Sequence, residues 1–266
     1  MRWVLGALLL SLSFGKAQMK DGKQLVTAEL LSSIRNPKGA FTVGIRFSIA
    51  PDWYLYWKNP GDAGLPIVVQ WALPDGWSAD QIAFPTPAKF AHDGIVAYGY
   101  KNEVILLATL RPKGTSKGPI EARLDWLVCR ESCLRGGTSV KLDLSQMGEE
   151  SLKQSSENID AARRKLPGTI KESGVFLGEA RMRKQGEEWS CTIGFSGKNA
   201  GAVSDFFPET NDDILVNFSS IGVAKNSMSF AFSRQNTKND SATLRGLLVT
   251  KESAFECEVP LKFPSY

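Results

Sequence analysis

Short runs in which apolar and polar residues alternate make up most of the chain, with turn residues between them. Residues 24–30 and 41–47 alternate in this way and are rich in β-branched and aromatic side chains. Such alternation predicts strands, and the Asn-Pro-Lys-Gly sequence at 36–39 predicts a turn between them. Further strands of the first half are expected at 53–57, 67–71, 103–110, 119–128 and 138–144.

Residues 74–102 interrupt this pattern. The segment contains Pro74, Pro85 and Pro87 and several glycines, and we expect it to be irregular. A loop region of this length inside a compact domain is usually functional or mobile.

A polar segment without strand character lies near the middle of the chain. The spacing of Ile159, Ala162 and Leu166 predicts a helix there, with Ser155 or Ser156 as the expected N-terminal cap. Basic residues near its end favour the C-terminal end of the helix dipole, and a Pro-Gly pair then stops the helix.

The alternating pattern resumes after this helix. Six more strands are expected at 175–182, 189–195, 214–219, 227–232, 242–249 and 254–263. Many short strands separated by turns predict an all-β protein with two β-sandwich domains joined by a short helical linker. The expected domains are 18–146 and 170–266, with the linker at 147–169.

Residues 1–17 have the composition of a secretory signal. Arg2 supplies the positive charge, residues 3–14 are mostly apolar, and Gly15 and Ala17 favour cleavage before Gln18. The apolar run is too short to span a bilayer. An uncleaved interfacial anchor is the alternative, and in both cases the rest of the protein faces an oxidising compartment in which disulfides form.

The charge balance and the single histidine exclude several classes of function. Without the signal segment the 266-residue chain keeps 30 basic and 28 acidic residues, a net charge of +2. That balance does not favour nucleic acid or an anionic membrane as a partner. His92 has no cysteine or carboxylate at ligand spacing, so we expect no metal site and no bound cofactor.

Cys129 and Cys133 are the strongest candidates for chemistry. A bridge between them closes so small a loop that it stabilises the fold by only about 2 kcal/mol in the chain-entropy model. A weakly stabilising, exposed disulfide is the kind that is reduced and re-formed, which predicts thiol–disulfide exchange. The alternative is a structural bridge in a non-enzymatic exported interaction module, and Cu(I) handling by the reduced pair is a third possibility. The spacing is not Cys-x-x-Cys and no βαβ pattern surrounds it, which argues against a thioredoxin fold.

Two further groups of residues have a structural and a functional interpretation. Cys191 and Cys257 lie in predicted strands, and a structural disulfide between them would contribute about 4 kcal/mol. Free buried thiols or a second redox pair are the alternatives. Five aromatic residues can pack in the core or form a wall around a reactive sulfur, where Tyr hydroxyls could hydrogen-bond a thiolate. They are Trp53, Tyr54, Tyr56, Trp57 and Trp71.

Three motifs carry a family resemblance. Residues 57–66 (WKNPGDAGLP), 98–100 (YGY) and 125–133 (DWLVCRESC) resemble the N-terminal periplasmic domain of DsbD and ScsB-like thiol:disulfide interchange proteins. The resemblance covers roughly residues 25–145 and is strongest to the branch with two such domains before the membrane part. Residues 205–208 (DFFP) and the Leu-Pro pair before residue 168 look like the second domain and the linker end of that branch.

The resemblance implies an immunoglobulin-like β-sandwich in the periplasm. It implies that the cysteine pair takes electrons from a membrane-embedded donor and passes them to periplasmic thioredoxin-like proteins. By position, Cys133 matches the cysteine that forms the mixed disulfide and Cys129 the resolving one. Tyr54 and Tyr56 match aromatic residues beside the active site, and we include Tyr98 in that group.

The resemblance also implies a cap loop at residues 90–98 that shields the disulfide until a partner docks. Two departures from the family pattern stand out. The spacer between the cysteines is shorter than in DsbD itself, and the cap-loop phenylalanine has no clear counterpart, since residues 97–99 (AYG) lie near its place. The chain carries no membrane or thioredoxin-like domain before Tyr266, so the expected donor acts in trans.

Overall fold

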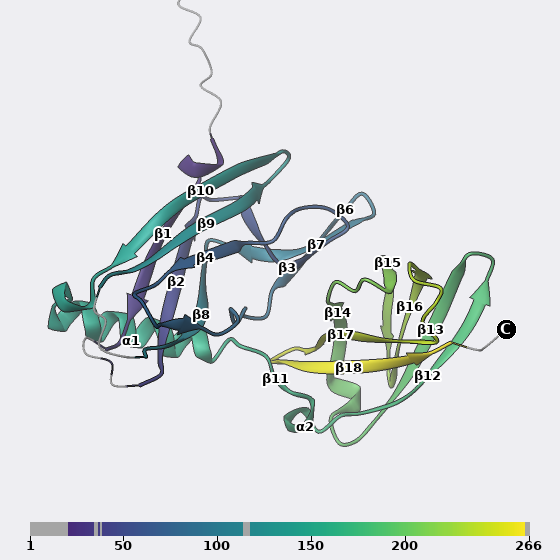
Figure 1. Cartoon of the computed structure of the whole chain (residues 1–266). Coiled ribbons are helices and arrows are strands. Elements are labelled where there is room, and N and C mark those ends of the chain that lie inside the picture. The colour runs from purple at the N-terminus through teal and green to yellow at the C-terminus, as the bar shows by residue number, and fades with distance from the viewer. Residues whose placement is uncertain (1–20, 35–36, 38, 114–117, 264–266) are drawn as a thin grey trace, which may run out of the picture.

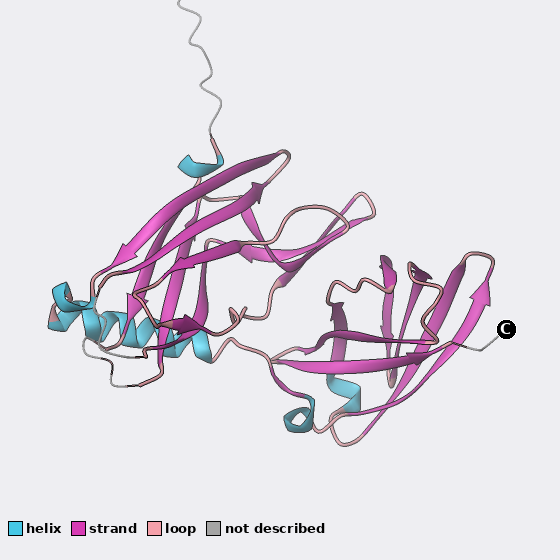
Figure 2. Cartoon of the chain, in the orientation of Figure 1, coloured by secondary structure: helices cyan, strands magenta, loops and turns pink. Residues whose placement is uncertain are grey.

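The computed structural model of the chain describes residues 21–34, 37, 39–113 and 118–263. The expected signal segment, residues 1–17, lies outside the described residues. Figure 1 shows two sandwiches of strands, with a helix running beneath the first, and Figure 2 shows how strongly strands predominate. The prediction of an all-β protein made of sandwich domains with a connecting helix is confirmed.

The first sandwich consists of two antiparallel sheets packed around one apolar core. One sheet has the order β1-β2-β8-β5, and the other has the order β10-β9-β3-β7-β6, with β4 also paired to β9. The strands are β1 (Val26–Ser32), β2 (Phe41–Ile49), β3 (Tyr54–Gly61), β4 (Val68–Ala72), β5 (Ser78–Ala79), β6 (Ala88–His92), β7 (Ile95–Lys101), β8 (Glu103–Arg111), β9 (Ile120–Cys129) and β10 (Cys133–Leu142).

The second sandwich follows the same plan with two four-stranded sheets, β11-β18-β17-β14 and β12-β13-β16-β15. Its strands are β11 (Gly168–Thr169), β12 (Phe176–Gln185), β13 (Glu188–Ser196), β14 (Val203–Pro208), β15 (Ile214–Ala224), β16 (Ser227–Arg234), β17 (Ser241–Thr250) and β18 (Ala254–Lys262). Short helical turns are η1 (Gly22–Gln24), η2 (Leu144–Gln146), α2 (Ile170–Ser173) and η3 (Ala200–Ala202).

The connecting helix α1 (Glu149–Arg163) is present where the spacing of apolar residues predicted it. Ile159 and Ala162 are buried against the first sandwich, where they pack with Leu31 of β1 and residues of β8. The helix begins after Gly148, so the expectation that Ser155 or Ser156 caps it is wrong. Two glutamates in the first turn favour this earlier start, since acidic side chains stabilise the N-terminal end of a helix dipole.

The expectation of an irregular segment at 74–102 is wrong for its second part. Strands β6 and β7 form a hairpin with Phe90 opposite Ala97, and β7 lies inside its sheet. Asp93 and Gly94 form the two-residue turn, with φ of 51° and 80°. Positive φ at both central residues matches the twist of a hairpin, and Asp-Gly is among the sequences that favour it.

The second sandwich packs against one end of the first and completes its core. Tyr98 of β7 is fully buried between Trp57 of β3 and two phenylalanines of the second sandwich, Phe207 and Phe218. Its ring centroid is 4.7 Å from that of Phe207. Its hydroxyl is buried without a hydrogen-bond partner. The two sandwiches therefore share apolar residues.

Polar contacts from the end of β3 reinforce this joint. Lys58 Nζ lies 2.5 Å from Glu209 Oε1, and Asn59 Nδ2 donates to the Pro208 carbonyl oxygen at 2.5 Å. Asn59 is almost fully buried, and its own Oδ1 accepts from the Gly61 amide, so both ends of its side chain are paired. A buried amide that is satisfied in this way fixes the orientation of the segment that carries it.

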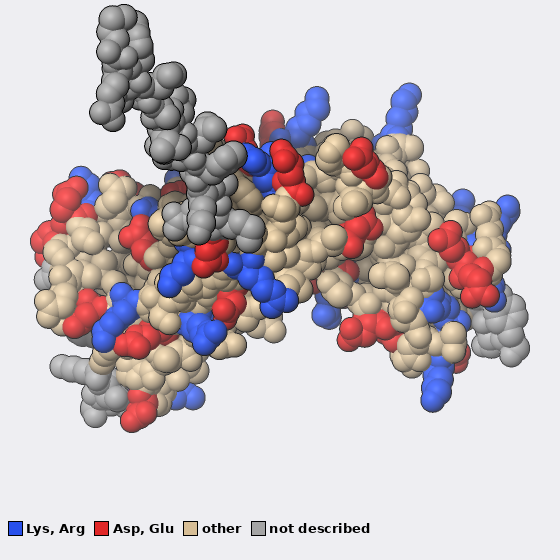
Figure 3. Space-filling view, turned by 90° about the horizontal axis from the view of Figure 1, so that it is seen from above, with Lys and Arg blue, Asp and Glu red and all other residues tan. Residues whose placement is uncertain are grey.

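Figure 3 shows both signs of charge interspersed over the face that it presents. This agrees with the near-balanced composition of the chain. Among the described residues, no helix has the length and apolar character needed to cross a bilayer.

Candidate active site

The cysteine pair closes the hairpin between β9 and β10. Cys129 is the last residue of β9, Cys133 is the first of β10, and the two are directly opposite in register. They form a disulfide with a Cα–Cα distance of 4.2 Å. Strand β10 thus begins at the second cysteine, five residues before its predicted start at Thr138. The turn between the cysteines is held by the Arg130 amide, which donates to the Ser132 carbonyl oxygen at 3.2 Å.

The two sulfurs differ sharply in accessibility. Cys129 is 1% exposed, whereas Cys133 is exposed. Cys129 belongs to a small buried cluster with Tyr56 and Ala97 on the outer face of the sheet, away from the main core. A reagent in solution therefore meets Cys133 first.

Strand β3 places two tyrosines beside the buried sulfur. Tyr54 is opposite Cys129 in register, and Tyr56 is two residues further along the same face. The Tyr56 hydroxyl donates to Cys129 Sγ at 3.1 Å and lies 3.6 Å from Cys133 Sγ. The Tyr54 hydroxyl is 3.4 Å from that of Tyr56. Burial, followed by the hydrogen bond and charge of Tyr54, raises the pKa of Tyr56, so its hydroxyl stays protonated near neutral pH.

The segment after β3 holds Tyr56 in place. The Asp62 carboxylate accepts from the Val96 amide at 2.7 Å, which ties this segment to β7. Gly64 has φ of 119°, and a Cβ there would lie 2.3 Å from the Tyr56 ring. Only glycine adopts this backbone readily and permits such a close approach. The segment from Asp62 to Gly64 therefore positions the tyrosine.

Phe90 completes the site and had been missed. Its ring centroid is 4.8 Å from that of Tyr54, and it packs against the cluster that contains Cys129. Lys101 Nζ lies 4.9 Å from the Phe90 ring. A phenylalanine thus borders the cysteine pair after all, although none was matched to the cap-loop position. The sequence signal was the Asp93-Gly94 pair, which favours a two-residue hairpin turn.

The other predicted aromatic neighbours lie elsewhere. Tyr98 is on the opposite face of β7 from Ala97, since side chains alternate along a strand, and it faces the joint between the sandwiches. Its expected place beside the cysteines is therefore wrong. Trp57 and Trp71 pack with the main core. Trp53 also contacts that core, and its ring lies 5.5 Å from the Arg130 guanidinium.

The predicted disulfide between Cys191 and Cys257 is absent, because the structure holds both as buried free thiols. They belong to opposite sheets of the second sandwich, Cys191 in β13 and Cys257 in β18, and both lie in its apolar core. The expectation rested on the place of both cysteines in predicted strands, which does not fix the distance between them across a core. Burial raises the pKa of each thiol to about 12.

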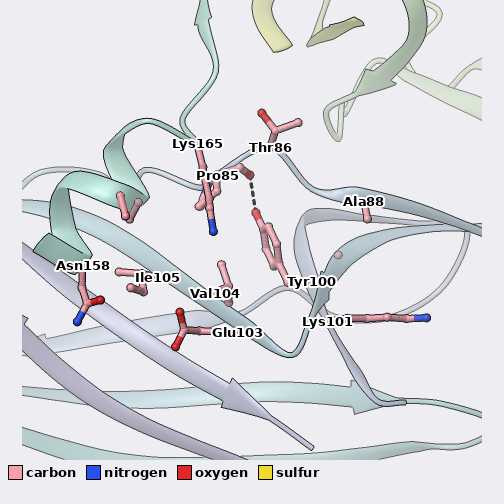
Figure 4. Close-up of a pocket in the computed structure, with 13 residues that line it drawn as sticks. Pro85, Thr86, Ala88, Tyr100, Lys101, Glu103, Val104, Ile105, Asn158 and Lys165 are labelled. Atoms are coloured by element: carbon pink, nitrogen blue, oxygen red, sulfur yellow. Dashed lines mark hydrogen bonds between the residues drawn. The ribbon is translucent and has the colours of Figure 1, made fainter. Parts of the chain in front are cut away.

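The described residues contain no group of three or more His, Cys, Asp or Glu side chains able to hold a metal ion. A groove of about 260 Å³ lies between α1 and strands β7 and β8. Figure 4 shows Lys165 pointing into it and the Tyr100 hydroxyl bonded to the Pro85 carbonyl oxygen. Neither cysteine lines this groove.

A β-sandwich that exposes one sulfur of a short-range disulfide and buries the other beneath a tyrosine defines a candidate thiol–disulfide exchange domain. The sequence profile of the family described as "Thiol:disulfide interchange protein DsbD, N-terminal" matches residues 23–145. The first sandwich is therefore similar to the N-terminal domains of that family.

The whole chain also resembles a solved structure, the N-terminal periplasmic domain of ScsB from Proteus mirabilis. The similarity covers 90% of this chain and 92% of that one, with a TM-score of 0.66 and 16% sequence identity. At that identity the likeness concerns the fold. No curated protein matches the chain by sequence.

Proposed function

We propose that this protein is a periplasmic thiol–disulfide exchange protein that relays reducing equivalents through Cys133 and Cys129. The donor is a membrane-embedded reductase, and the acceptors are thioredoxin-like proteins. The family of the first sandwich supports an interchange role. The observation that carries the assignment of roles is the contrast between exposed Cys133 and buried Cys129.

The forward reaction starts from the reduced pair. The Cys133 thiolate attacks one sulfur of the acceptor disulfide, forming a mixed disulfide while the second acceptor sulfur leaves as a thiolate. The Cys129 thiolate then attacks Cys133 Sγ. The Cys129–Cys133 bond forms, the first acceptor sulfur leaves, and two electrons have passed to the acceptor.

Reloading runs the same steps in reverse. A thiolate of the donor attacks the exposed Cys133 Sγ, and Cys129 leaves as a thiolate. The second donor thiolate then attacks the donor sulfur of this mixed disulfide, and Cys133 leaves as a thiolate, so the donor is oxidised to its own disulfide. The Tyr56 hydroxyl already donates to Cys129 Sγ, so it can stabilise the charge that forms there. Hydrogen bonds to charged acceptors are stronger than those to neutral ones, which makes this contact more favourable after reduction.

A redox titration tests the proposal. The purified protein is equilibrated in glutathione or dithiothreitol buffers, and alkylated cysteines are counted by mass spectrometry. We expect reversible opening of Cys129–Cys133 at a potential that other exchange proteins reach. If the pair stays oxidised below about −300 mV, as structural bridges do, the relay is excluded and a non-enzymatic interaction module remains.

A trapping experiment tests the separate roles. The Cys129→Ser variant lacks the resolving thiol, so it should accumulate a mixed disulfide through Cys133 with an oxidised thioredoxin-like protein. The matched Cys133→Ser variant should trap far less, because its remaining sulfur is buried. Equal trapping by both variants would contradict the assigned order of attack.

A further inference from the structure

We infer that the second sandwich determines which sulfur of the pair reacts, by holding the β6–β7 hairpin against Cys129 through an ion pair between Lys89 and Asp205. The inference rests on the proposed exchange at Cys129–Cys133 and assigns a specificity role to two residues outside that site. It gives the second sandwich a part in the chemistry of the first.

Two neighbouring residues of β6 carry the argument. Lys89 is opposite Tyr98 in the hairpin and shares the face of the sheet that meets the second sandwich. Phe90 is opposite Ala97 and shares the outer face with the cysteine cluster. Because successive side chains of a strand point to opposite faces, one strand contacts both the second sandwich and the cysteine site.

The ion pair is placed to restrain the hairpin. Lys89 Nζ lies 3.0 Å from Asp205 Oδ2 and 3.3 Å from Oδ1. The two side chains are 25% and 26% exposed, so the pair is screened less than a fully exposed one. The Phe206 amide also donates to Asp205 Oδ1 at 2.8 Å, which orients the carboxylate.

Strand β6 has little other support within its sheet. Among the described strands, β6 is an edge strand that pairs with β7 alone. Figure 1 shows the hairpin projecting from the first sandwich on the side of the second one. An edge strand held on one side frays more readily than an interior strand, so a contact from the second sandwich affects how long Phe90 remains on Tyr54.

The chemical consequence concerns the site of attack. With Phe90 in place, Cys129 is buried and an incoming thiolate or electrophile reaches Cys133. If the hairpin lifts, Cys129 becomes reachable as well. An attack on Cys129 Sγ would form a mixed disulfide at Cys129 and expel Cys133 as the thiolate. The Tyr56 hydroxyl is 3.6 Å from Cys133 Sγ but 3.1 Å from Cys129 Sγ, so it would stabilise this thiolate less well.

The test measures the reactivity of each sulfur in the full chain. The reduced protein is treated with limiting iodoacetamide and digested with trypsin, which cleaves after Arg130 and places the two cysteines on different peptides. We expect Cys133 to be alkylated much faster than Cys129. Lys89→Asp and Asp205→Lys should each raise the fraction of alkylation that falls on Cys129 about three- to fivefold. The double variant, which restores an ion pair with reversed signs, should return this fraction toward the original.

Controls separate this effect from general loss of structure. Asp80→Lys breaks an exposed pair with Arg111 on the first sandwich and should leave the ratio unchanged. If the charge reversals fail to fold, Asp205→Asn removes the charge with the smallest change of shape. An unchanged ratio in folded Asp205→Asn and Lys89→Asp, or single-variant effects that the double variant does not reverse, would overturn the inference. The alkylation ratio is measured without a partner protein, so a failure of this inference can be distinguished from a failure of the proposed relay.

Discussion

The hydroxyl of Tyr56 donates a hydrogen bond to Cys129 Sγ over 3.1 Å, and both side chains are almost completely buried. This contact joins the central strand β3 to the end of β9 at the buried sulfur of the cysteine pair. A thiolate accepts such a bond more strongly than a disulfide sulfur does, so the contact favours the reduced state.

Removing this hydroxyl should therefore make the pair harder to reduce. In Tyr56→Phe we expect the reduction potential to fall by about 10–30 mV, the equivalent of a hydrogen bond of about 0.5–1.5 kcal/mol in a two-electron couple. Equilibration with glutathione buffers measures the shift. Tyr100→Phe is the matched control, because its hydroxyl bonds to Pro85 and not to sulfur. A potential that rises in Tyr56→Phe would contradict the assigned role.

Gly64 should tolerate no side chain. Its φ of 119° and its position against the Tyr56 ring combine backbone strain with overpacking. We expect Gly64→Ala to lower the free energy of unfolding by about 2–4 kcal/mol in urea titrations. Gly39→Ala, with open space around its Cβ, should change it by less than about 0.5 kcal/mol. If Gly64→Ala lowers the free energy of unfolding as little as Gly39→Ala does, the segment after β3 accommodates a Cβ at Gly64 and the prediction is wrong.

The buried thiols of the second sandwich should make stability sensitive to high pH. The folded pKa of Cys191 and Cys257 is raised to about 12, above the ordinary value of about 9. Their protonated form is therefore favoured by folding, and this contribution is complete below pH 9 and is lost as pH rises toward 12. Urea unfolding under reducing conditions should show a loss of up to about 1.4 kcal/mol per pH unit for each thiol.

The double variant Cys191→Ala/Cys257→Ala controls for other groups and should show a flatter pH dependence than the original chain. The free thiols themselves can be counted without reductant. Both should react with iodoacetamide after unfolding and resist it before. Finding neither thiol in the unfolded, unreduced protein would mean that a bridge forms between them, contrary to the structure.

Phe207 should couple the two sandwiches. It packs on Tyr98 and is buried, so Phe207→Ala should lower the free energy of unfolding by about 3 kcal/mol and separate one thermal transition into two. Phe176→Ala removes the same atoms from a residue that is 68% exposed and should have almost no effect. A single unshifted transition in Phe207→Ala would contradict the shared core.

Most of the fold could be predicted because many of the sandwich strands have one buried and one exposed face. Alternation gave the strands of the main sheets within a few residues, and helical spacing gave the face of α1 that packs on β8. The hairpin of β6 and β7 was missed because β7 is buried on five successive residues, Val96 to Tyr100, so the alternation is lost there. Strand β14 was missed for the same reason, since Phe206, Phe207 and Pro208 are all buried.

The site was predicted in part, for physical reasons that differ between residues. The cysteines and the two tyrosines, Tyr54 and Tyr56, lie on three neighbouring strands, β10, β9 and β3, and their register brings them together. Phe90 reaches the same face from a fourth strand, β6, through pairing that local sequence does not specify. The prediction that Tyr98 lies beside the cysteines was wrong because a shift of one residue along β7 moves a side chain to the opposite face of the sheet.

The shared core has a consequence for how the chain can be divided or recombined. The segment that matches the family profile ends at residue 145, yet Phe207, Phe218, Leu247 and Ala254 belong to the core of the first sandwich. A fragment cut at that border would leave an apolar patch around Tyr98 in water, a surface that promotes association. A chimera that exchanges the second sandwich would have to bring its own replacements for those four side chains. The segment that matches the family is thus shorter than the segment that supplies side chains to the first core.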